Sequence, residues 1–335
     1  MPHRNVPRIA LRTVRVLVTG AGGPAAISVM KSLSADSSVQ LIAADMDPWA
    51  AGLYLVPPQA RTLIPAGLDP GFVDATLARC IAMGVDVLIP TVDTELRPLG
   101  RARADFAEAG IELLLAPDQA LDVTLDKLAL ARRCAGQVRV PRTERLDAAG
   151  DLASWTYPVI VKPRTGSGSR DISLVGSAAD LARCGGSDDL VVQEYLPGEE
   201  YSVDVLADAA GHVVASVPRV RERVDSGVSV AGRTLHDAEL ERLGAAVVTV
   251  TGVTYIANVQ FRRNAAGLPA LLEVNPRVPG TLPLTVASGV DMPRMALDSL
   301  RGRPLPDRAG FRDVAMVRYL QERFIELGEV SSVAA

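Results

Sequence analysis

The sequence predicts an α/β protein whose amino-terminal part forms a parallel sheet and whose carboxy-terminal part is α+β around an antiparallel sheet. Two features of the sequence support this fold class. Up to about residue 117, short apolar runs alternate with helical stretches, the order expected when helices connect parallel strands. From about residue 118 on, stretches with alternating apolar and polar residues follow one another directly, which indicates antiparallel pairing.

The composition limits the class of protein. With 335 residues, 48% hydrophobic and 22% charged, the chain is long enough for two or three globular domains. The formal net charge is −4 and no dense Lys/Arg block occurs, so we expect neither nucleic acid nor membrane as a partner. Three scattered cysteines favour reduced thiols and a cytoplasmic location. Residues 1–13 read as a tail without the apolar core of a signal peptide.

In the amino-terminal region, four strands are expected at 14–19, 39–45, 85–90 and 111–115, with helices ending near 33 and over 70–83 and 95–109. A Gly-rich turn at 20–26 leads from the first strand into a helix N-terminus, where free amides can hold an anion. Together with Asp45 it resembles a dinucleotide fingerprint loosely. We favour the alternative, in which the glycines only permit a tight turn and close helix packing.

Polar side chains follow the third of these strands. Thr91, Asp93 and Glu95 come just after a strand's carboxyl end, where ligands of open α/β sheets bind. They could contact a substrate or cap the next helix. Capping is the favoured interpretation for Thr91 and Asp93.

A hairpin is expected where the second region begins. An amphipathic stretch at 121–134 contains Lys127, and a strand at 157–163 ends in Lys162-Pro163. A small-residue loop at 164–170 and a further strand at 172–175 follow. Backbone amides of such a flap can close over phosphates, although no helix follows the glycines as in a Walker loop. Lys162 is therefore interpreted as a phosphate contact rather than a solvated strand end.

Further strands are expected at 190–196, 201–206 and 212–217, with helices over 237–251 and 291–301. Arg219, Arg221 and Arg223 alternate with Val220 and Glu222, which would place positive charge on one strand face. Either a solvated, charge-protected edge strand or an anion site for a substrate carboxylate or phosphate explains this pattern.

The strand expected at 271–277 is the most informative stretch. Glu273, Asn275 and Arg277 should share one face, and a neighbouring strand at 256–261 places Asn258 and Gln260 on one face. A carboxylate, an amide and a guanidinium suit a divalent cation beside phosphate. The alternative is ordinary polar residues on a wet sheet face.

Taken in order, these motifs resemble the ATP-grasp superfamily, in particular the short relatives of the carbamoyl-phosphate synthase large chain. The resemblance covers about 14–305 and follows from six motifs: Asp126-Lys127, Val159–Pro163 with its Gly/Ser loop, Gln193–Leu196, Gly198–Asp204, Asn258–Phe261 and Glu273–Arg277. It implies a tail at 1–13, a pre-ATP-grasp domain at 14–117, a lid subdomain at 118–195, a core subdomain at 196–305 and an extension at 306–335.

The resemblance also implies roles for single residues. ATP would contact Lys127, Lys162, the flap residues Gly166, Ser167, Gly168 and Ser169, the adenine hinge Glu194, Tyr195 and Leu196, and the ribose acid Glu200. Magnesium or manganese would bind Gln260, Glu273 and Asn275. Arg277 and Lys162 would act on the phosphates in catalysis, and Arg221, Arg223 and Arg277 are candidates for the substrate.

The activity implied is ligation: Mg-ATP converts a carboxylate to an acyl phosphate, which an amine or thiol then attacks, with amino-acid-like small molecules as substrates. A homodimer is possible by the same analogy. Two alternatives stay open, an NAD(P)-dependent oxidoreductase or epimerase using the Gly-rich turn, and a non-catalytic ATP-binding regulator. The chain holds one grasp unit and nothing resembling a Cys-His glutaminase site, which argues against carbamoyl phosphate synthesis itself.

Overall fold

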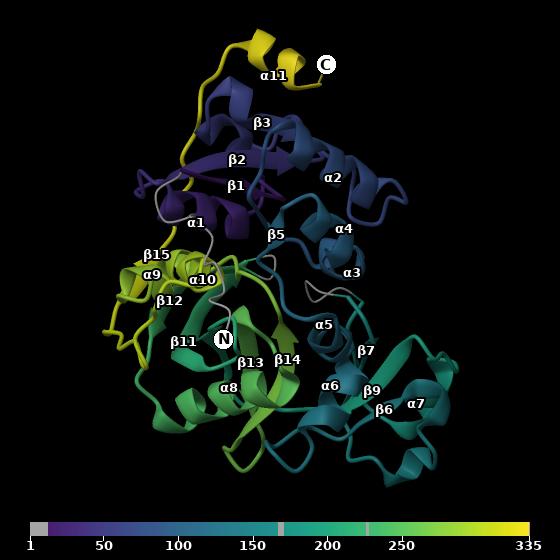
Figure 1. The fold of residues 1–335 in the computed structure, drawn as a ribbon. Coiled ribbons are helices and arrows are strands. Elements are labelled where there is room, and N and C mark those ends of the chain that lie inside the picture. The colour runs from purple at the N-terminus through teal and green to yellow at the C-terminus, as the bar shows by residue number, and fades with distance from the viewer. Residues whose placement is uncertain (1–12, 167–170, 226–227, 335) are drawn as a thin grey trace, which may run out of the picture. The chain divides into compact units, whose positions relative to one another are not determined.

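The computed structural model describes residues 13–166, 171–225 and 228–334, and the chain divides into two compact units (Figure 1). The first unit contains the chain up to Leu114, Pro293–Leu305 and the residues from Gln321 on. The second contains Leu115–Met292 and Pro306–Leu320. The chain thus returns to the first unit twice after leaving it. The finer divisions expected at 195 and 305 stay predictions.

The first unit holds a parallel sheet, as predicted; it has five strands rather than the expected four, in the order β3-β2-β1-β4-β5. Its strands are β1 Val14–Val18, β2 Val39–Asp45, β3 Arg61–Leu63, β4 Val87–Ile89 and β5 Glu112–Leu113. The sequence did not reveal β3, which has only three residues and no apolar run. The central strands β1 and β4 are almost wholly buried, which explains their continuous apolar sequence.

Helices flank this sheet. They are α1 Pro24–Leu33, α2 Phe72–Ala82, α3 Asp93–Arg101 and α4 Arg103–Glu108. The single helix expected over 95–109 is therefore two, which meet at Ala102. From the distant end of the sequence, α10 (Met292–Leu300) contributes most of its residues to this unit, and α11 (Leu327–Ala334) packs against β3.

The second unit contains two antiparallel sheets, of order β6-β9-β7-β8 and β14-β13-β10-β11-β12-β15. The strands of the smaller sheet are β6 Thr143–Arg145, β7 Val159–Pro163, β8 Ser173–Val175 and β9 Leu190–Glu194. Those of the larger are β10 Glu200–Ala207, β11 Val213–Asp225, β12 Val228–Thr234, β13 Tyr255–Arg263, β14 Pro269–Asn275 and β15 Ala315–Val317. The hairpin predicted around the Gly/Ser loop is confirmed by the antiparallel pairing of β7 with β8.

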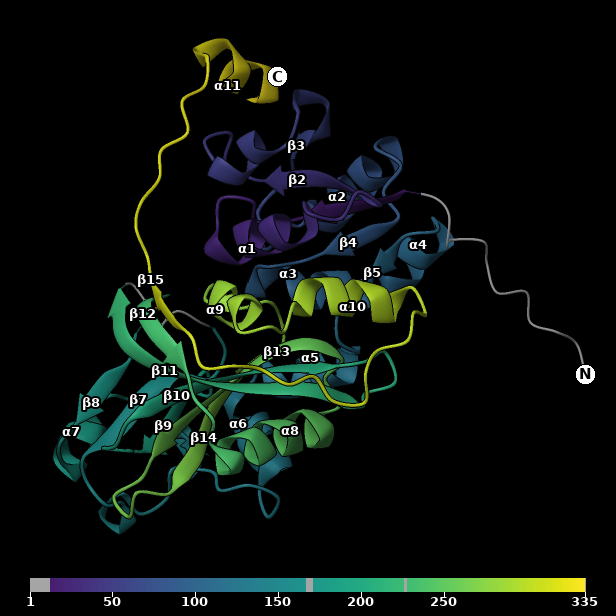
Figure 2. The same ribbon diagram turned by 90° about the vertical axis from the view of Figure 1, so that its left-hand side faces the viewer.

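The helices of this unit are α5 Asp118–Thr124, α6 Lys127–Cys134, α7 Ala178–Arg183, α8 Ala238–Thr251 and α9 Leu282–Ala287. The longest, α8, packs along β10 and β11 (Figure 2). A Cβ on Gly244 would meet Val203 Cγ1 at 2.7 Å, so the glycine allows the close approach of helix and sheet. This packing buries one face of the large sheet and leaves the other face for polar side chains.

The amphipathic stretch expected over 121–134 is broken at Asp126. Its Oδ1 accepts hydrogen bonds from the amides of Leu128 and Ala129, which makes Asp126 the N-cap of α6. Its Oδ2 lies 2.6 Å from Nη2 of Arg164. The cap places Lys127 at the first position of α6, facing the hairpin loop. In the part of the chain that the structure describes, no helix is long and apolar enough to cross a bilayer.

Candidate active site

The predicted metal ligands lie side by side on two paired strands. The register of β13 and β14 sets Gln260 opposite Glu273 and Asn258 opposite Asn275. Asn275 Nδ2 donates to Glu273 Oε1 at 3.3 Å, and Gln260 Nε2 donates to Asn258 Oδ1 at 3.4 Å. Because both amides donate through nitrogen, their oxygens are left beside the carboxylate as acceptors. This is a donor set that fits a hard divalent cation.

Arg277 does not continue the strand as expected. β14 ends at Asn275, and the amide of Arg277 donates to the Asn275 carbonyl at 2.9 Å in the following turn. Its Nη1 donates to the carbonyl of Val278 at 3.2 Å. No group of three or more His, Cys, Asp or Glu side chains with metal-binding geometry occurs among the described residues, so any site here depends on amide oxygens.

Lys162 is buried rather than solvated, with 6% of its surface exposed. Its Nζ donates to Gln193 Oε1 at 2.8 Å, and Gln193 Nε2 donates to Thr143 Oγ1 at 2.8 Å. This relay crosses the small sheet from β7 through β9 to β6. These hydrogen bonds fix the position of the Lys162 ammonium group, as a contact with a ligand phosphate requires.

Three charged residues from three other motifs act electrostatically on Lys162. Burial lowers the pKa of Lys162 to about 8, the carboxylates of Glu273 and Glu200 raise it, and the Lys127 ammonium lowers it. Lys127 Nζ also donates to the carbonyl of Gly166 at 2.9 Å, in the hairpin loop. Two lysine ammonium groups near two carboxylates are a charge arrangement that suits a polyanion arriving with its own cation. The predicted flap residues Ser167, Gly168 and Ser169 lie outside the described residues.

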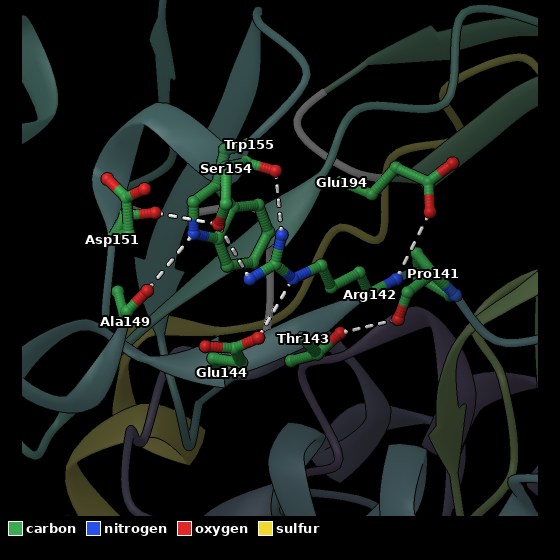
Figure 3. A network of polar contacts seen from close by, with 9 residues as sticks. All are labelled: Pro141, Arg142, Thr143, Glu144, Ala149, Asp151, Ser154, Trp155 and Glu194. Atoms are coloured by element: carbon green, nitrogen blue, oxygen red, sulfur yellow. Dashed lines mark hydrogen bonds and ion pairs between the residues drawn. The ribbon is translucent and has the colours of Figure 1, made fainter. Parts of the chain in front are cut away.

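The predicted hinge begins at the end of β9, where Glu194 is braced by Arg142 (Figure 3). The amide of Arg142 donates to Glu194 Oε2 at 3.1 Å, and the amide of Glu194 donates to the Arg142 carbonyl at 2.8 Å. The Arg142 guanidinium lies 4.0 Å over the Trp155 ring and donates to Glu144 and Ser154. This brace, which the sequence did not reveal, fixes the strand from which Tyr195 and Leu196 continue; Leu196 is buried.

The three alternating arginines have three different environments. Arg219 is fully buried in an ion pair with Asp204, and Arg221 pairs with Glu200 in the adjacent strand. Arg223 is exposed, like Glu222 and Val224 beside it, near the end of β11 where the pairing with β12 is irregular. The single positive face predicted for them does not form. The predicted ribose acid Glu200 is thus already held by Arg221.

Three backbone amides of the Gly-rich turn in the first unit already have hydrogen-bond partners within the protein. The amide of Gly22 donates to Asp45 Oδ2 at 2.8 Å, and the amides of Ala21 and Gly23 donate to the carbonyls of Ala44 and Gly20. A Cβ on Gly52 would lie 2.1 Å from the carbonyl oxygen of Ala21, so the following segment packs directly on the turn. These three amides are bonded internally and are not available to an anion, which agrees with the interpretation favoured from the sequence.

Helix α3 begins after Val92, which makes no side-chain capping hydrogen bond, and the acid buried in its first turn is Glu95. Its buried carboxyl accepts a hydrogen bond from the Thr19 hydroxyl and is also bonded by the backbone amides of Val92 and Thr91. The Thr91 hydroxyl donates instead to the Thr19 carbonyl at 2.8 Å. The capping expected for Thr91 is therefore wrong.

The two antiparallel sheets carry a buried lysine on one and amide and carboxylate donors on the other, which is the arrangement expected from the resemblance to the ATP-grasp superfamily. Residues 186–323 match the family "ATP-grasp in the biosynthetic pathway with Ter operon", and residues 16–114 match the "PylC-like, N-terminal domain". The arginine-specific carbamoyl phosphate synthase large chain of Bacillus subtilis (strain 168) is 27% identical over 223 residues. That match covers 60% of this chain and 21% of the relative, so this chain corresponds to only a small part of it.

Solved structures share the fold. Biotin carboxylase from Campylobacter jejuni, in a β-γ-ATP complex, superposes with a TM-score of 0.73 at 18% identity, covering 89% of this chain and 73% of that one. N5-carboxyaminoimidazole synthetase from Staphylococcus aureus, complexed with ADP, gives 0.71 at 15% identity, with 92% and 83% covered. L-amino acid ligase from Bacillus licheniformis gives 0.64 at 14% identity, with 86% and 74% covered. At these identities the likeness shows the fold alone.

Proposed function

We propose that this protein is an ATP-dependent ligase that activates a carboxylate as an acyl phosphate and transfers the acyl group to an amine or thiol. The observation that supports this most directly is the pairing of Gln260 with Glu273 and of Asn258 with Asn275, within electrostatic reach of buried Lys162. Phosphoryl transfer needs positioning and charge neutralisation more than covalent help from the protein. Lysine, arginine and a divalent-cation site supply both.

Each residue has a role in the proposed reaction. Lys127 and Lys162 bind the phosphates and neutralise their charge. The adenine is bound by the hinge residues Glu194, Tyr195 and Leu196, and the ribose hydroxyls by Glu200. Gln260, Glu273 and Asn275 would hold Mg²⁺ or Mn²⁺, which supplies Lewis-acid charge neutralisation at the phosphates when bound. Arg277, in the turn directly after β14, stabilises the charge on the phosphoryl group that is transferred.

The proposed reaction balances in two steps. A carboxylate oxygen attacks the γ-phosphorus, the bond from this phosphorus to the β,γ-bridging oxygen breaks, and ADP leaves. The amine lone pair then attacks the acyl carbon, the bond from this carbon to the phosphate oxygen breaks, and phosphate leaves while the amine loses a proton. The acyl phosphate hydrolyses readily, so the hairpin loop at 164–170 is proposed to close over it and exclude water.

We further propose amino-acid-like substrates, with Arg223 and Arg277 among the residues near the carboxylate. Arg221, paired with Glu200, is better placed to orient the ribose acid than to hold a substrate. A cytoplasmic homodimer is part of the same proposal.

The test is turnover of Mg-ATP by the purified protein with pairs of amino acids. We expect ADP and phosphate to form together with at least one pair. Lys162→Met and Glu273→Gln should lose at least about 100-fold in rate, because each removes charge stabilisation at the phosphates. Lys31→Met and Glu239→Gln, which alter exposed residues, are the matched controls.

The variants should also keep cooperative thermal unfolding, which separates lost chemistry from lost folding. Full activity of Glu273→Gln would contradict its metal role. If no pair yields ADP although Mg-ATP stabilises the protein, ligation is the wrong reaction while nucleotide binding stands.

A further inference from the structure

Arg318 extends the edge strand of the large sheet on the face that carries the predicted metal ligands. Its amide donates to the carbonyl of Val230 at 2.9 Å, and Val317 pairs with Ala231. Side chains alternate from exposed Ala315 and Val317 to half-buried Met316 and Arg318.

The register relates this face to the active site. Across the sheet, Glu273 pairs with Gln260, Gln260 with Ser202, Ser202 with Arg219, and Arg219 with Thr234. Met316 opposes Gly232, two residues before Thr234 on β12, and therefore shares the face of Thr234. Arg318, two residues beyond Met316, thus points to the same face of the sheet as Glu273.

Arg318 follows β15, at the opposite edge of the sheet from β14, but the loop after β14 reaches towards it. Arg318 Nη2 donates to the carbonyl of Gly280, in the segment that joins β14 to α9. Gly280 follows Arg277 by three residues, and three residues of extended chain span at most about 11 Å. The Arg318 guanidinium therefore lies within the length of a small substrate of the turn that carries Arg277.

Arg318 is a cation without a carboxylate partner in the described part of the chain. Its Nε is buried and makes no hydrogen bond to any described residue. Arg219 and Arg221 each have an acid, whereas the charged group that acts on Arg318 is another cation. Burial lowers the pKa of Arg318, and Arg219 lowers it further. A partly buried charge that no acid neutralises costs folding free energy, so an anion that pairs with the guanidinium would bind favourably.

We propose that Arg318 binds a carboxylate that does not react, on the amine-bearing substrate, which makes that substrate an amino acid. The proposal rests on the proposed ligase function and specifies one of its two substrates. The carboxylate that becomes phosphorylated must lie at the γ-phosphate, beside Arg277 and the metal ligands. Arg318 lies at the other end of the 276–281 segment, where its half-buried guanidinium, which no acid of the described residues neutralises, can pair with a carboxylate.

The test compares amino acids with their carboxamides, which lack only the charged group. In the presence of Mg-ADP, we expect at least one amino acid to raise the melting temperature of the wild-type protein while its carboxamide does not. In Arg318→Met, amino-acid binding should weaken about 10- to 100-fold, the loss expected for one charge-assisted hydrogen bond. Arg318→Lys should recover part of this loss, because it restores the charge without the planar fork.

Two controls separate recognition from folding. Arg323→Gln, at an exposed position five residues further on, should bind amino acids like the wild type. Without ligand, Arg318→Met should melt no lower than the wild type, since it removes an uncompensated charge; a strongly lowered melting temperature would indicate a structural arginine and overturn the proposal.

The remaining outcomes are distinguishable from failure of the ligase function. Equal binding of amino acids and carboxamides, or unchanged binding by Arg318→Met, would overturn the role of Arg318 even if ADP is formed in turnover. If Mg-ATP stabilises the protein but no amino acid does, the carboxylate site is wrong and nucleotide binding stands. If amino acids bind through Arg318 but no ADP forms, the site is supported and the ligase function fails.

Discussion

Glu95 is a buried acid at the carboxyl edge of the parallel sheet. Burial raises its pKa to about 7 from 4.5, against the hydrogen bonds from Thr19 and the amides of Val92 and Thr91. Because the folded-state pKa lies above the unfolded value, the unfolded protein ionises first as the pH rises. Stability should therefore fall between about pH 4.5 and pH 7, and stay lower above that range.

We predict that Glu95→Gln removes this pH dependence. The wild type should lose on the order of 3 kcal/mol of unfolding free energy between about pH 4.5 and pH 8 relative to the variant, the equivalent of the shift in pKa. Urea unfolding at several pH values measures it, with Glu108→Gln, an exposed acid of α4, as control. Parallel stability profiles of Glu95→Gln and wild type would show that folding does not raise the pKa of this carboxyl.

At the scale of secondary-structure elements, a buried polar network joins three strands and a helix of the second unit. Asp204 of β10 accepts two hydrogen bonds from Arg219 of β11, at 2.8 and 2.6 Å. Asn258 of β13 and Thr285 of α9 donate to the same carboxylate at 2.8 and 2.6 Å. Both charged side chains are almost completely buried. The network therefore fixes α9, and with it the loop after β14, on the sheet.

We predict that Arg219→Met costs about 3–5 kcal/mol of stability, because it leaves a buried carboxylate without its cation. Asp204→Asn combined with Arg219→Met should cost clearly less, since neither charge then remains and the amide oxygen still accepts from Thr285. Chemical unfolding of both single variants and the double variant gives the coupling energy. Arg233→Met, at an exposed ion pair with Glu222, is the control and should change little. Additive effects of the two substitutions would mean that the pair is not coupled.

At the scale of the whole molecule, the distribution of lysines is informative. The chain has 32 arginines but only three lysines, Lys31, Lys127 and Lys162. Two of the three lie in the candidate phosphate site. Lysine carries a compact charge on a thin stem, which suits the buried position beside Gln193, whereas the arginine fork is wider. Scarcity of lysine is a signal in the sequence that narrows the candidates to three positions and supports the two that the motifs indicate.

The same scarcity allows a labelling experiment on the native protein. An amine-selective acylating reagent should modify exposed Lys31 whether or not nucleotide is present, and buried Lys162 only slowly. Saturating Mg-ATP should reduce modification of Lys127 several-fold, because the phosphates occupy its ammonium. Peptide mass spectrometry gives the extent at each site, with urea-denatured protein as the reference for full reactivity. Unchanged labelling of Lys127 in the presence of stabilising Mg-ATP would place the phosphates elsewhere.

Much of this protein follows from local sequence. The parallel sheet, the hairpin around the Gly/Ser loop and the pairing of the strands that carry Gln260 and Glu273 are confirmed, because apolar alternation and turn residues act over a few positions. The end of β14 before Arg277 and the shifted register beside Arg223 were missed. Strand ends and register shifts depend on the strand that pairs alongside, which is many residues away in the sequence. The alternation of residues within one strand therefore does not predict them.

The sequence by itself determined the fold class, the order of the motifs and the residue types available to bind nucleotide and metal. Only the tertiary structure decided how the charges are paired. Arg219 and Arg221 are neutralised by Asp204 and Glu200, whereas Arg318 has no acid to pair with in the described chain. The physical reason is that the stability of a buried charge depends on which groups surround it in space, and those groups come from strands distant in the sequence.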